Sequence, residues 1–328
     1  MVDLSRRKLA PLALTVLGVP ALASRATAQD GGPGVQASIA RFASVTPAAS
    51  CLVVVEGPGA PWRAAHQPST RMFVGSAVKT FILAQFMRDV EAGRLTETQQ
   101  TRIHDSVRSL SSPVFLELTG TTPAKSALEA MITHSDNTAT DVALAAVGPD
   151  RVRALIAEAG LAAMQIPDST RRMFSYLAGA PEGVDVGWAG MQRLIKEPVG
   201  KDARPALNDR HTMASTAEDL VKWYQQALRG AFFKQPDTLL EFKRIQAMAD
   251  ALAYVAPPDT LAYGKGGSID WNNFHCFSLA GQMIVAKVPV TFCFTVNWTG
   301  PDDGVSKVFG AFKEAVAGTL EEAAKTVA

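Results

Sequence analysis

The stretch that decides the fold runs from residue 261 to 298 and reads LAYGKGGSIDWNNFHCFSLAGQMIVAKVPVTFCFTVNW. It contains three runs rich in apolar, β-branched and aromatic residues, at 261–268, 274–285 and 290–298, and such runs are typical of β-strands. Two asparagines separate the first two runs, and a Lys-Val-Pro triplet separates the last two. Because connections this short join antiparallel strands, the stretch predicts three antiparallel strands in succession.

Two further strands are expected near the N-terminus, at 51–55 and 71–74, with a Gly-Pro-Gly connection between them. A helix at about 35–45 precedes them, and a helix from about 305 to 325 follows the C-terminal strands. We therefore expect an α+β fold, with one five-stranded antiparallel sheet flanked by helices. The two groups of strands would meet around an all-helical insertion.

The insertion begins at Ser76, where the apolar residues change from strand to helical spacing and continue to Gly93. Further helices are expected at about 125–134, 138–147, 150–159 and 216–229, and a loop at 196–210. One domain, residues 29–328, would thus consist of a sheet lobe (about 35–75 and 255–328) and a helical lobe (about 76–254).

Composition and charge exclude several classes of protein. Hydrophobic residues make up 47% of the 328 residues and charged residues 19%, which is neither a disordered nor a fibrous composition. The formal charge is +1, and the first 28 residues carry +3, so the remainder carries 1 − 3 = −2. Such a chain has no basic excess for nucleic acid, and it contains no spacing typical of a metal site or a nucleotide cofactor.

Residues 1–28 have the pattern of a signal peptide, with a basic segment at 6–8 (RRK), an apolar run, and a cleavage site at 26–28 (ATA). The segment 5–9 (SRRKL) is similar to a twin-arginine export signal, and an ordinary signal with paired arginines is the alternative. Either route predicts a periplasmic or secreted protein. No later segment offers about 20 uninterrupted apolar residues, so we expect a soluble monomer without a membrane span.

Three cysteines, Cys51, Cys276 and Cys293, allow at most one intramolecular disulfide. Cys276 and Cys293 fall on consecutive expected strands, and Cys51 on a strand that could neighbour the last, so Cys293 could pair with either in an oxidising compartment. The alternative is three buried thiols, because twin-arginine substrates fold before export.

Three short motifs carry the candidate chemistry. Ser76 and Lys79 lie one turn apart at the start of a helix, so the ammonium can reach the hydroxyl. Lysine can take the serine proton if burial or nearby positive charge lowers its pKa. The second motif, 135–137 (SDN), falls between two expected helices. The third, 265–267 (KGG), falls on an expected strand, where glycine often indicates the close approach of a ligand or another backbone.

In this order the motifs resemble those of the active-serine penicillin-recognising enzymes, and class A β-lactamases most of all. The segment 132–141 (ITHSDNTATD) and the order of elements from about 35 to 325 are similar to that family's whole domain. The resemblance implies a β-lactamase/transpeptidase-like fold. It also implies Ser76 as the acylated nucleophile, Lys79 as its proton acceptor and Ser135 as the hydroxyl that passes a proton to the leaving nitrogen, while Asn137 would bind Lys79 and substrate.

The same resemblance implies a substrate-binding strand. Lys265 would polarise the serine of the second motif and attract a substrate carboxylate, and Gly267 follows on the same strand. The backbone N–H groups of Ser76 and Ser268 would form the oxyanion hole. Gly266 stands where the family carries Thr or Ser, and no arginine occurs after residue 244 to supply the guanidinium of many relatives. The carboxylate clamp is therefore expected to be weakened.

A second departure concerns hydrolysis of the acyl-enzyme. Class A enzymes hold the water with a Glu in an E-x-x-L-N segment, whereas residues 166–174 read IPDSTRRMF here. Asp168 is the nearest acid and Glu182 is a later candidate for the base. The alternative for each is a loop carboxylate, solvated or paired with Arg171 or Arg172. Efficient deacylation is therefore not expected from the motif pattern.

Three functional hypotheses follow for a small-molecule substrate and no cofactor. The leading one is a periplasmic serine hydrolase of class A β-lactamase type that opens a β-lactam amide through an acyl-Ser76 intermediate. The second is an esterase or D-Ala-type peptidase on the same machinery, favoured by the weakened clamp. The third is a covalent penicillin-binding or sensing protein that acylates without efficient turnover, favoured by the missing Glu.

Overall fold

A computed structural model of the chain describes residues 30–57, 61–197 and 199–327. The expected signal peptide and its cleavage site lie outside the described residues. The fold is α+β with a main sheet of five antiparallel strands, as the sequence predicts. The strand order is β2-β1-β9-β8-β7. The strands are β1 (Ala48–Val55), β2 (Trp62–His66), β7 (Leu261–Trp271), β8 (Phe274–Val285) and β9 (Val288–Thr299).

The three C-terminal strands form the continuous antiparallel group expected from the sequence. Asn272 and Asn273 adopt positive φ angles of 48° and 62° in the first turn, a conformation that asparagine tolerates better than most residues. The N-terminal strand β1 then pairs with β9, with Leu52 opposite Cys293. This pairing joins the two ends of the chain in one sheet.

The expected strand at 71–74 is wrong as a member of the main sheet. The second N-terminal strand is β2, in which Trp62 and Ala64 are buried and Arg63 is exposed. Alternating burial of this kind is typical of a strand, although few residues of β2 are strongly apolar. The more apolar segment β3 (Met72–Phe73) pairs instead with β6 (Ala214–Ser215). The apolar run therefore leads into the helical lobe instead of extending the sheet.

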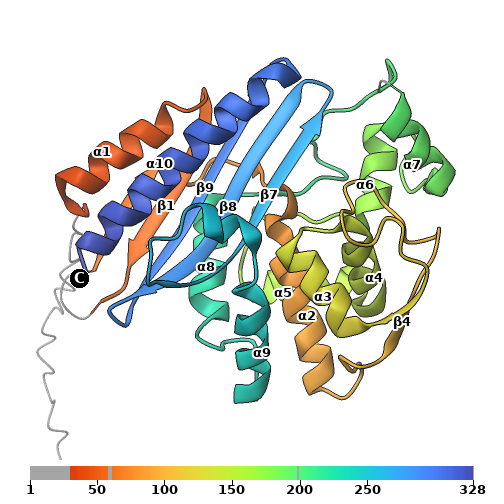
Figure 1. Cartoon of the computed structure of the whole chain (residues 1–328), viewed down its shortest axis with the longest axis horizontal. Coiled ribbons are helices and arrows are strands. Elements are labelled where there is room, and N and C mark those ends of the chain that lie inside the picture. The colour runs from red at the N-terminus through yellow and green to blue at the C-terminus, as the bar shows by residue number, and fades with distance from the viewer. Residues whose placement is uncertain (1–29, 58–60, 198, 328) are drawn as a thin grey trace, which may run out of the picture.

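Helices cover both faces of the sheet (Figure 1). On one face lie α1 (Gly32–Ala43) and α10 (Val305–Lys325), where Phe42 packs on Phe294 with ring centroids 5.0 Å apart. The opposite face contacts α8 (Ala217–Ala227), which packs on β1, β8 and β9. Because successive side chains of a strand point to opposite faces, Phe294 points toward the layer of α1 and α10, and its neighbour Cys293 points toward the opposite face of the sheet.

The helical lobe is built between β3 and β7. Its helices are α2 (Lys79–Glu91), α3 (Ala124–Thr133), α4 (Asn137–Val147), α5 (Pro149–Glu158), α6 (Thr170–Leu177), α7 (Gly187–Lys196) and α9 (Pro236–Gln246), with short 3-10 helices η1 (Gly75–Val78) and η2 (Asp250–Tyr254) at its ends. The sequence predicts neither α6, α7 nor α9. The insertion is also not all-helical, because β4 (Gln100–Ile103) pairs with β5 (Gly120–Pro123).

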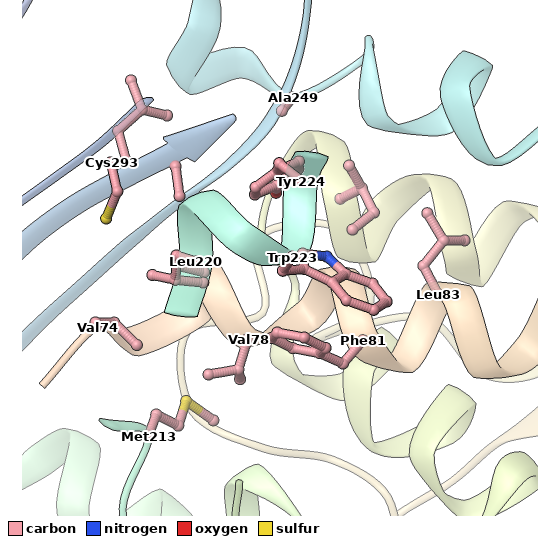
Figure 2. Close-up of a cluster of buried hydrophobic side chains, with 14 of the residues drawn as sticks. Val74, Val78, Phe81, Leu83, Met213, Leu220, Trp223, Tyr224, Ala249 and Cys293 are labelled. Carbon is pink, nitrogen blue, oxygen red and sulfur yellow. The ribbon is translucent and has the colours of Figure 1, made fainter. Parts of the chain in front are cut away.

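A buried aromatic cluster fixes α2 against α8 (Figure 2). The rings of Phe81 and Trp223 lie 4.4 Å apart between centroids, and the Trp223 indole donates to Thr80 Oγ1 at 3.0 Å. Burying an aromatic side chain of this size contributes about 1.5–3 kcal/mol. Since α8 packs on the sheet, this cluster sets the position of α2 relative to the strands.

The three cysteines are buried free thiols, which is the alternative without a disulfide. Across the strands Cys276 faces Asn297 and Cys293 faces Ala280 and Leu52, so the register does not place any two of the cysteines opposite each other. Burial raises the pKa of the Cys51 and Cys293 thiols to about 12. None of the helices in the described part of the chain is long and apolar enough to cross a membrane.

Candidate active site

Ser76 lies on η1, the single turn that leads from β3 into α2. Gly75 before it has a positive φ of 52°, and a Cβ there would come 2.9 Å from the Ser268 amide nitrogen. A Cβ on Gly267 would come 2.1 Å from the Val74 carbonyl oxygen and 2.9 Å from the Ser76 amide nitrogen. Two glycines thus let the backbones of η1 and β7 abut, which brings together the amide groups that an oxyanion hole requires.

Lys79 is the first residue of α2 and is fully buried. Its Nζ donates to Asn137 Oδ1 at 2.8 Å, to Ser135 Oγ at 3.2 Å and to the Ser135 carbonyl oxygen. Burial first, and then the positive charge of Lys265, hold the pKa of Lys79 well below its usual 10.5, although two aspartates oppose them. The lowered pKa favours the neutral amine, which is the form that a general base requires.

The loop between α3 and α4 holds Ser135 and Asn137 in place. Buried Asp136 caps α4 by accepting from the Ala139 amide at 2.7 Å, and its other oxygen accepts from the amides of residues 114 and 115. Ser135 adopts a positive φ of 57°, a strained conformation for a non-glycine residue. Asn137 donates to the Leu110 carbonyl oxygen at 2.8 Å, so its Oδ1 is directed at Lys79.

Lys265 is buried on β7, and its Nζ donates to the Gly266 carbonyl oxygen at 2.8 Å. Burial lowers its pKa to about 8, and the nearby Asp250 carboxylate opposes the shift. Together with Ser135, Gly266, Gly267 and Ser268, this lysine lines a cavity of about 230 Å³. The structure therefore brings the three sequence motifs to one place, from η1–α2, the α3–α4 loop and β7.

The two candidate deacylation bases have other partners. Asp168 pairs with Arg153 at 2.5 Å and with Arg172 at 3.3 Å, and the Arg153 guanidinium holds the pKa of Asp168 below its usual value. Glu182 is exposed and lies 3.9 Å from both Arg210 and His211. Neither carboxylate lines the cavity beside Lys265. Asp168 is therefore a loop carboxylate paired with Arg172, which is the alternative that the sequence left open, and Arg153 is its second partner.

Sequence reasoning missed Asp141, one helical turn after Asn137 on α4. It is buried, and its carboxylate accepts from the backbone amides of Thr170 and Arg171 at 2.6 and 3.1 Å. Burial raises its pKa to about 6. Asp141 therefore fixes the start of α6 beside the helix that carries Asn137, and the spacing of four residues was the signal that could have found it.

Two further missed residues, Asp250 on η2 and Leu279 on β8, line the cavity with Lys265. Leu279 stands opposite Gly266 across the β7–β8 ladder, which places an apolar side chain on the next strand beside the third motif. Only the strand register reveals this pairing, because the residues are 13 positions apart (279 − 266).

Residues 35–276 match the model of the family described as the β-lactamase enzyme family. Among solved structures, a β-lactamase from Sphaerobacter thermophilus has a TM-score of 0.66 and 17% identity over 89% of this chain and 96% of that chain. The chromosome-encoded β-lactamase of Vibrio parahaemolyticus has a TM-score of 0.64 and 17% identity over 89% and 97%. A mutant of PBP-A in an acyl-enzyme complex with penicillin G has a TM-score of 0.62 and 15% identity over 89% and 98%. No curated protein sequence matches the chain.

The family match covers well over half of the chain, and the solved structures share its fold over nearly their full lengths. The chain therefore belongs to the β-lactamase enzyme family, a family of hydrolases.

Proposed function

We propose that this protein is a serine hydrolase of class A β-lactamase type, which opens a β-lactam amide through an acyl-Ser76 intermediate. The observation that carries the proposal is the buried Lys79, one turn after Ser76, whose pKa is held well below normal and whose Nζ contacts Ser135 and Asn137. A buried lysine whose pKa is lowered in this way has the property that serine activation needs.

In the proposed reaction neutral Lys79 takes the proton from Ser76 Oγ as that oxygen attacks the carbonyl carbon. The backbone N–H groups of Ser76 and Ser268 stabilise the oxyanion. When the tetrahedral intermediate collapses, Ser135 Oγ gives its proton to the leaving nitrogen and is reprotonated from the Lys79 ammonium. Water then cleaves the acyl-Ser76 ester, releasing the acid and restoring the serine hydroxyl.

A second candidate function, ester hydrolysis on the same machinery, has a specific observation in its favour. Gly266 carries no hydroxyl and faces Leu279 across the strands, so this position supplies no polar side chain for a substrate carboxylate, although Lys265 and Ser268 remain beside it. Esters need no such anchor. We also propose that the protein is exported to the periplasm, on the strength of the RRK and ATA segments within residues 1–28.

Acylation of Ser76 is tested by intact-mass spectrometry after exposure to a penicillin and, separately, to an activated ester. The proposal expects one covalent adduct per chain that Ser76→Ala abolishes. Ser268→Ala is the matched control, because its backbone N–H remains and the adduct should still form. An adduct of equal yield in Ser76→Ala would overturn the assignment of the nucleophile.

A further inference from the structure

The β7–β8 hairpin ends in a row of three side chains that lie opposite one another across three strands. In the strand register Asp270 of β7 faces His275 of β8, and His275 faces Trp298 of β9. The imidazole of His275 is fully buried and stacks on the Trp298 indole, with ring centroids 4.9 Å apart and an angle of 28° between the ring planes. A buried imidazole in the middle of such a row needs partners within the protein for both of its nitrogens.

Both ring nitrogens have an oxygen partner. Nδ1 lies 2.8 Å from Asp270 Oδ1, and Nε2 lies 2.8 Å from the carbonyl oxygen of Gly300, which follows β9. A carbonyl oxygen can only accept a hydrogen bond, and so can an ionised carboxylate. Both nitrogens must therefore donate, and an imidazole does so only when it carries a second proton and a positive charge. In the neutral form one nitrogen lone pair would face an oxygen lone pair inside the protein.

The charged groups around the ring favour the imidazolium. Among the described residues these groups are the carboxylates of Asp270 on β7 and of Asp302 on η3 (Asp302–Gly304), and Asp302 Oδ1 lies 3.8 Å from Nε2. Burial by itself lowers the pKa of His275, but the two hydrogen bonds and the two negative charges outweigh burial and raise that pKa above its usual value. The face of the stacked indole also attracts a cation.

The contacts of His275 join separate parts of the fold. Asp270 belongs to β7, the strand of the third motif, and Gly300 leads from β9 into η3 and α10. On the opposite face of β7 the Trp271 indole donates to the Arg204 carbonyl oxygen at 3.1 Å. The end of the hairpin is thus a joint between the sheet lobe and the helical lobe, and the protonated histidine holds this joint to the start of α10.

We propose that His275 is a pH-sensitive clamp, which as an imidazolium ties the β7–β8 hairpin to the start of α10 and which releases the end of the hairpin when it loses its proton to solvent. The proposal does not depend on the acylation of Ser76. Because the folded state binds this proton more tightly than the unfolded chain, the stabilisation is complete below about pH 6.5, the usual pKa of histidine. It is lost as the pH rises through the higher pKa of the folded state.

NMR of protein labelled with ¹⁵N in its histidine rings tests the charge of His275. The wild-type protein should show two N–H groups in this ring near neutral pH and a pKa above the usual value, and the signal that His275→Gln removes assigns it. Asp270→Asn keeps an oxygen for the hydrogen bond but removes the charge, so it should lower the pKa of His275. Asp303→Asn removes the same charge one residue beyond Asp302 and is the matched control, with a much smaller effect expected.

Amide hydrogen exchange tests the release of the hairpin. After correction for the intrinsic effect of pH on exchange, protection of residues 270–276 should fall by about tenfold as the pH rises through the pKa of His275, the usual scale for losing a hydrogen bond to a charged group. In Asp270→Asn this fall should begin at lower pH. The amides of the β4–β5 hairpin are the internal reference and should keep their protection.

Three results would overturn the proposal. A single ring N–H near neutral pH, or a pKa at or below the usual value, rules out the imidazolium. A raised pKa combined with protection of residues 270–276 that does not change with pH shows a fixed ion pair and rules out the switch. An equal loss of protection in the β4–β5 hairpin shows general unfolding instead of local release. Failure of a penicillin or an ester to acylate Ser76 would leave the clamp standing.

Discussion

At the scale of single residues, the candidate site contains two buried lysines, and the charge of one lowers the pKa of the other. Lys79 and Lys265 are both fully buried, and the Lys265 ammonium lowers the pKa of Lys79. The pKa of Lys265 nevertheless stays at about 8, because Asp250 opposes the effect of burial. In the proposed reaction the pair divides the work, with Lys79 as the base and Lys265 as the positive charge beside Ser135.

This division predicts a bell-shaped dependence of acylation on pH. The rate should rise with pH through the depressed pKa of Lys79, since the neutral amine is the active form, and fall above about pH 8 as Lys265 loses its charge. Lys265→Gln removes a positive neighbour, which raises the pKa of Lys79, so the rising limb should move to higher pH and the falling limb should vanish. Stopped-flow measurement of acylation across pH checks both limbs.

Arginine variants are the matched controls for this pH prediction. Lys265→Arg keeps the charge, so its rising limb should stay in place, while Lys79→Arg should nearly eliminate acylation because a guanidinium cannot give up its proton. A rising limb that stays in place in Lys265→Gln, or mild and equal losses in both arginine variants, would mean that Lys79 is structural and not the base.

At the scale of elements, the site depends on how closely η1 approaches β7. The sequence indicates Ser76 at a helix start and two glycines on a strand, but it does not show that the two segments touch. Their contact is a property of tertiary packing, since a Cβ at Gly267 would lie 2.1 Å from the Val74 carbonyl oxygen and 2.8 Å from the Ala77 amide nitrogen. Those neighbours are backbone atoms and cannot rotate away.

Gly267→Ala is therefore expected to push β7 away from η1. We predict a loss of about 1–3 kcal/mol in the free energy of unfolding and a fall in acylation of about 10²–10³, the usual cost of displacing one oxyanion donor. Gly310→Ala on α10 is the control, because its Cβ would meet open space and alanine favours a helix by up to about 1 kcal/mol over glycine. Chemical denaturation should show that Gly267→Ala is less stable than wild type and that Gly310→Ala is not, and adduct formation should fall in Gly267→Ala alone. Full activity in Gly267→Ala would contradict the close approach.

The elements also show where sequence patterns suffice and where they do not. The strands at 261–271, 274–285 and 288–299 carry strong apolar patterns and short turns, and the structure confirms them with small shifts at their ends. Strand β2 was missed because its pattern consists of Trp62 and two alanines, too weak to compete with the apolar Met72–Phe73 segment. The helix α6 follows a loop whose sequence does not show that Asp141 anchors the start of the helix.

At the scale of the whole molecule, the sheet lobe and the helical lobe contribute different residues to the candidate site. The helical lobe carries Lys79, Ser135 and Asn137, and the sheet lobe carries Lys265 and Ser268. The order of the three motifs along the chain was enough to predict this assembly. The cavity beside Lys265 was not predictable, because its walls include residues of η2, β8 and α10, which come together only through the register of the sheet and the packing of α10 on it.

The last prediction concerns the step that neither lobe is seen to support, hydrolysis of the acyl-enzyme. A general base typically contributes about 10²–10⁴ in rate, and among the described residues both sequence candidates are held elsewhere, Asp168 by Arg153 and Arg172 and Glu182 at an exposed position near Arg210. A chromogenic β-lactam should therefore give one equivalent of product in a burst and then a slow phase. 4-Nitrophenyl acetate should turn over faster, because its small acetyl group leaves room for water.

Asp168→Asn and Glu182→Gln should leave both phases unchanged in single-turnover and steady-state kinetics. A burst that becomes more pronounced in one amide variant would identify that residue as the base, and rapid β-lactam hydrolysis without a burst in all three proteins would show that another group activates the water.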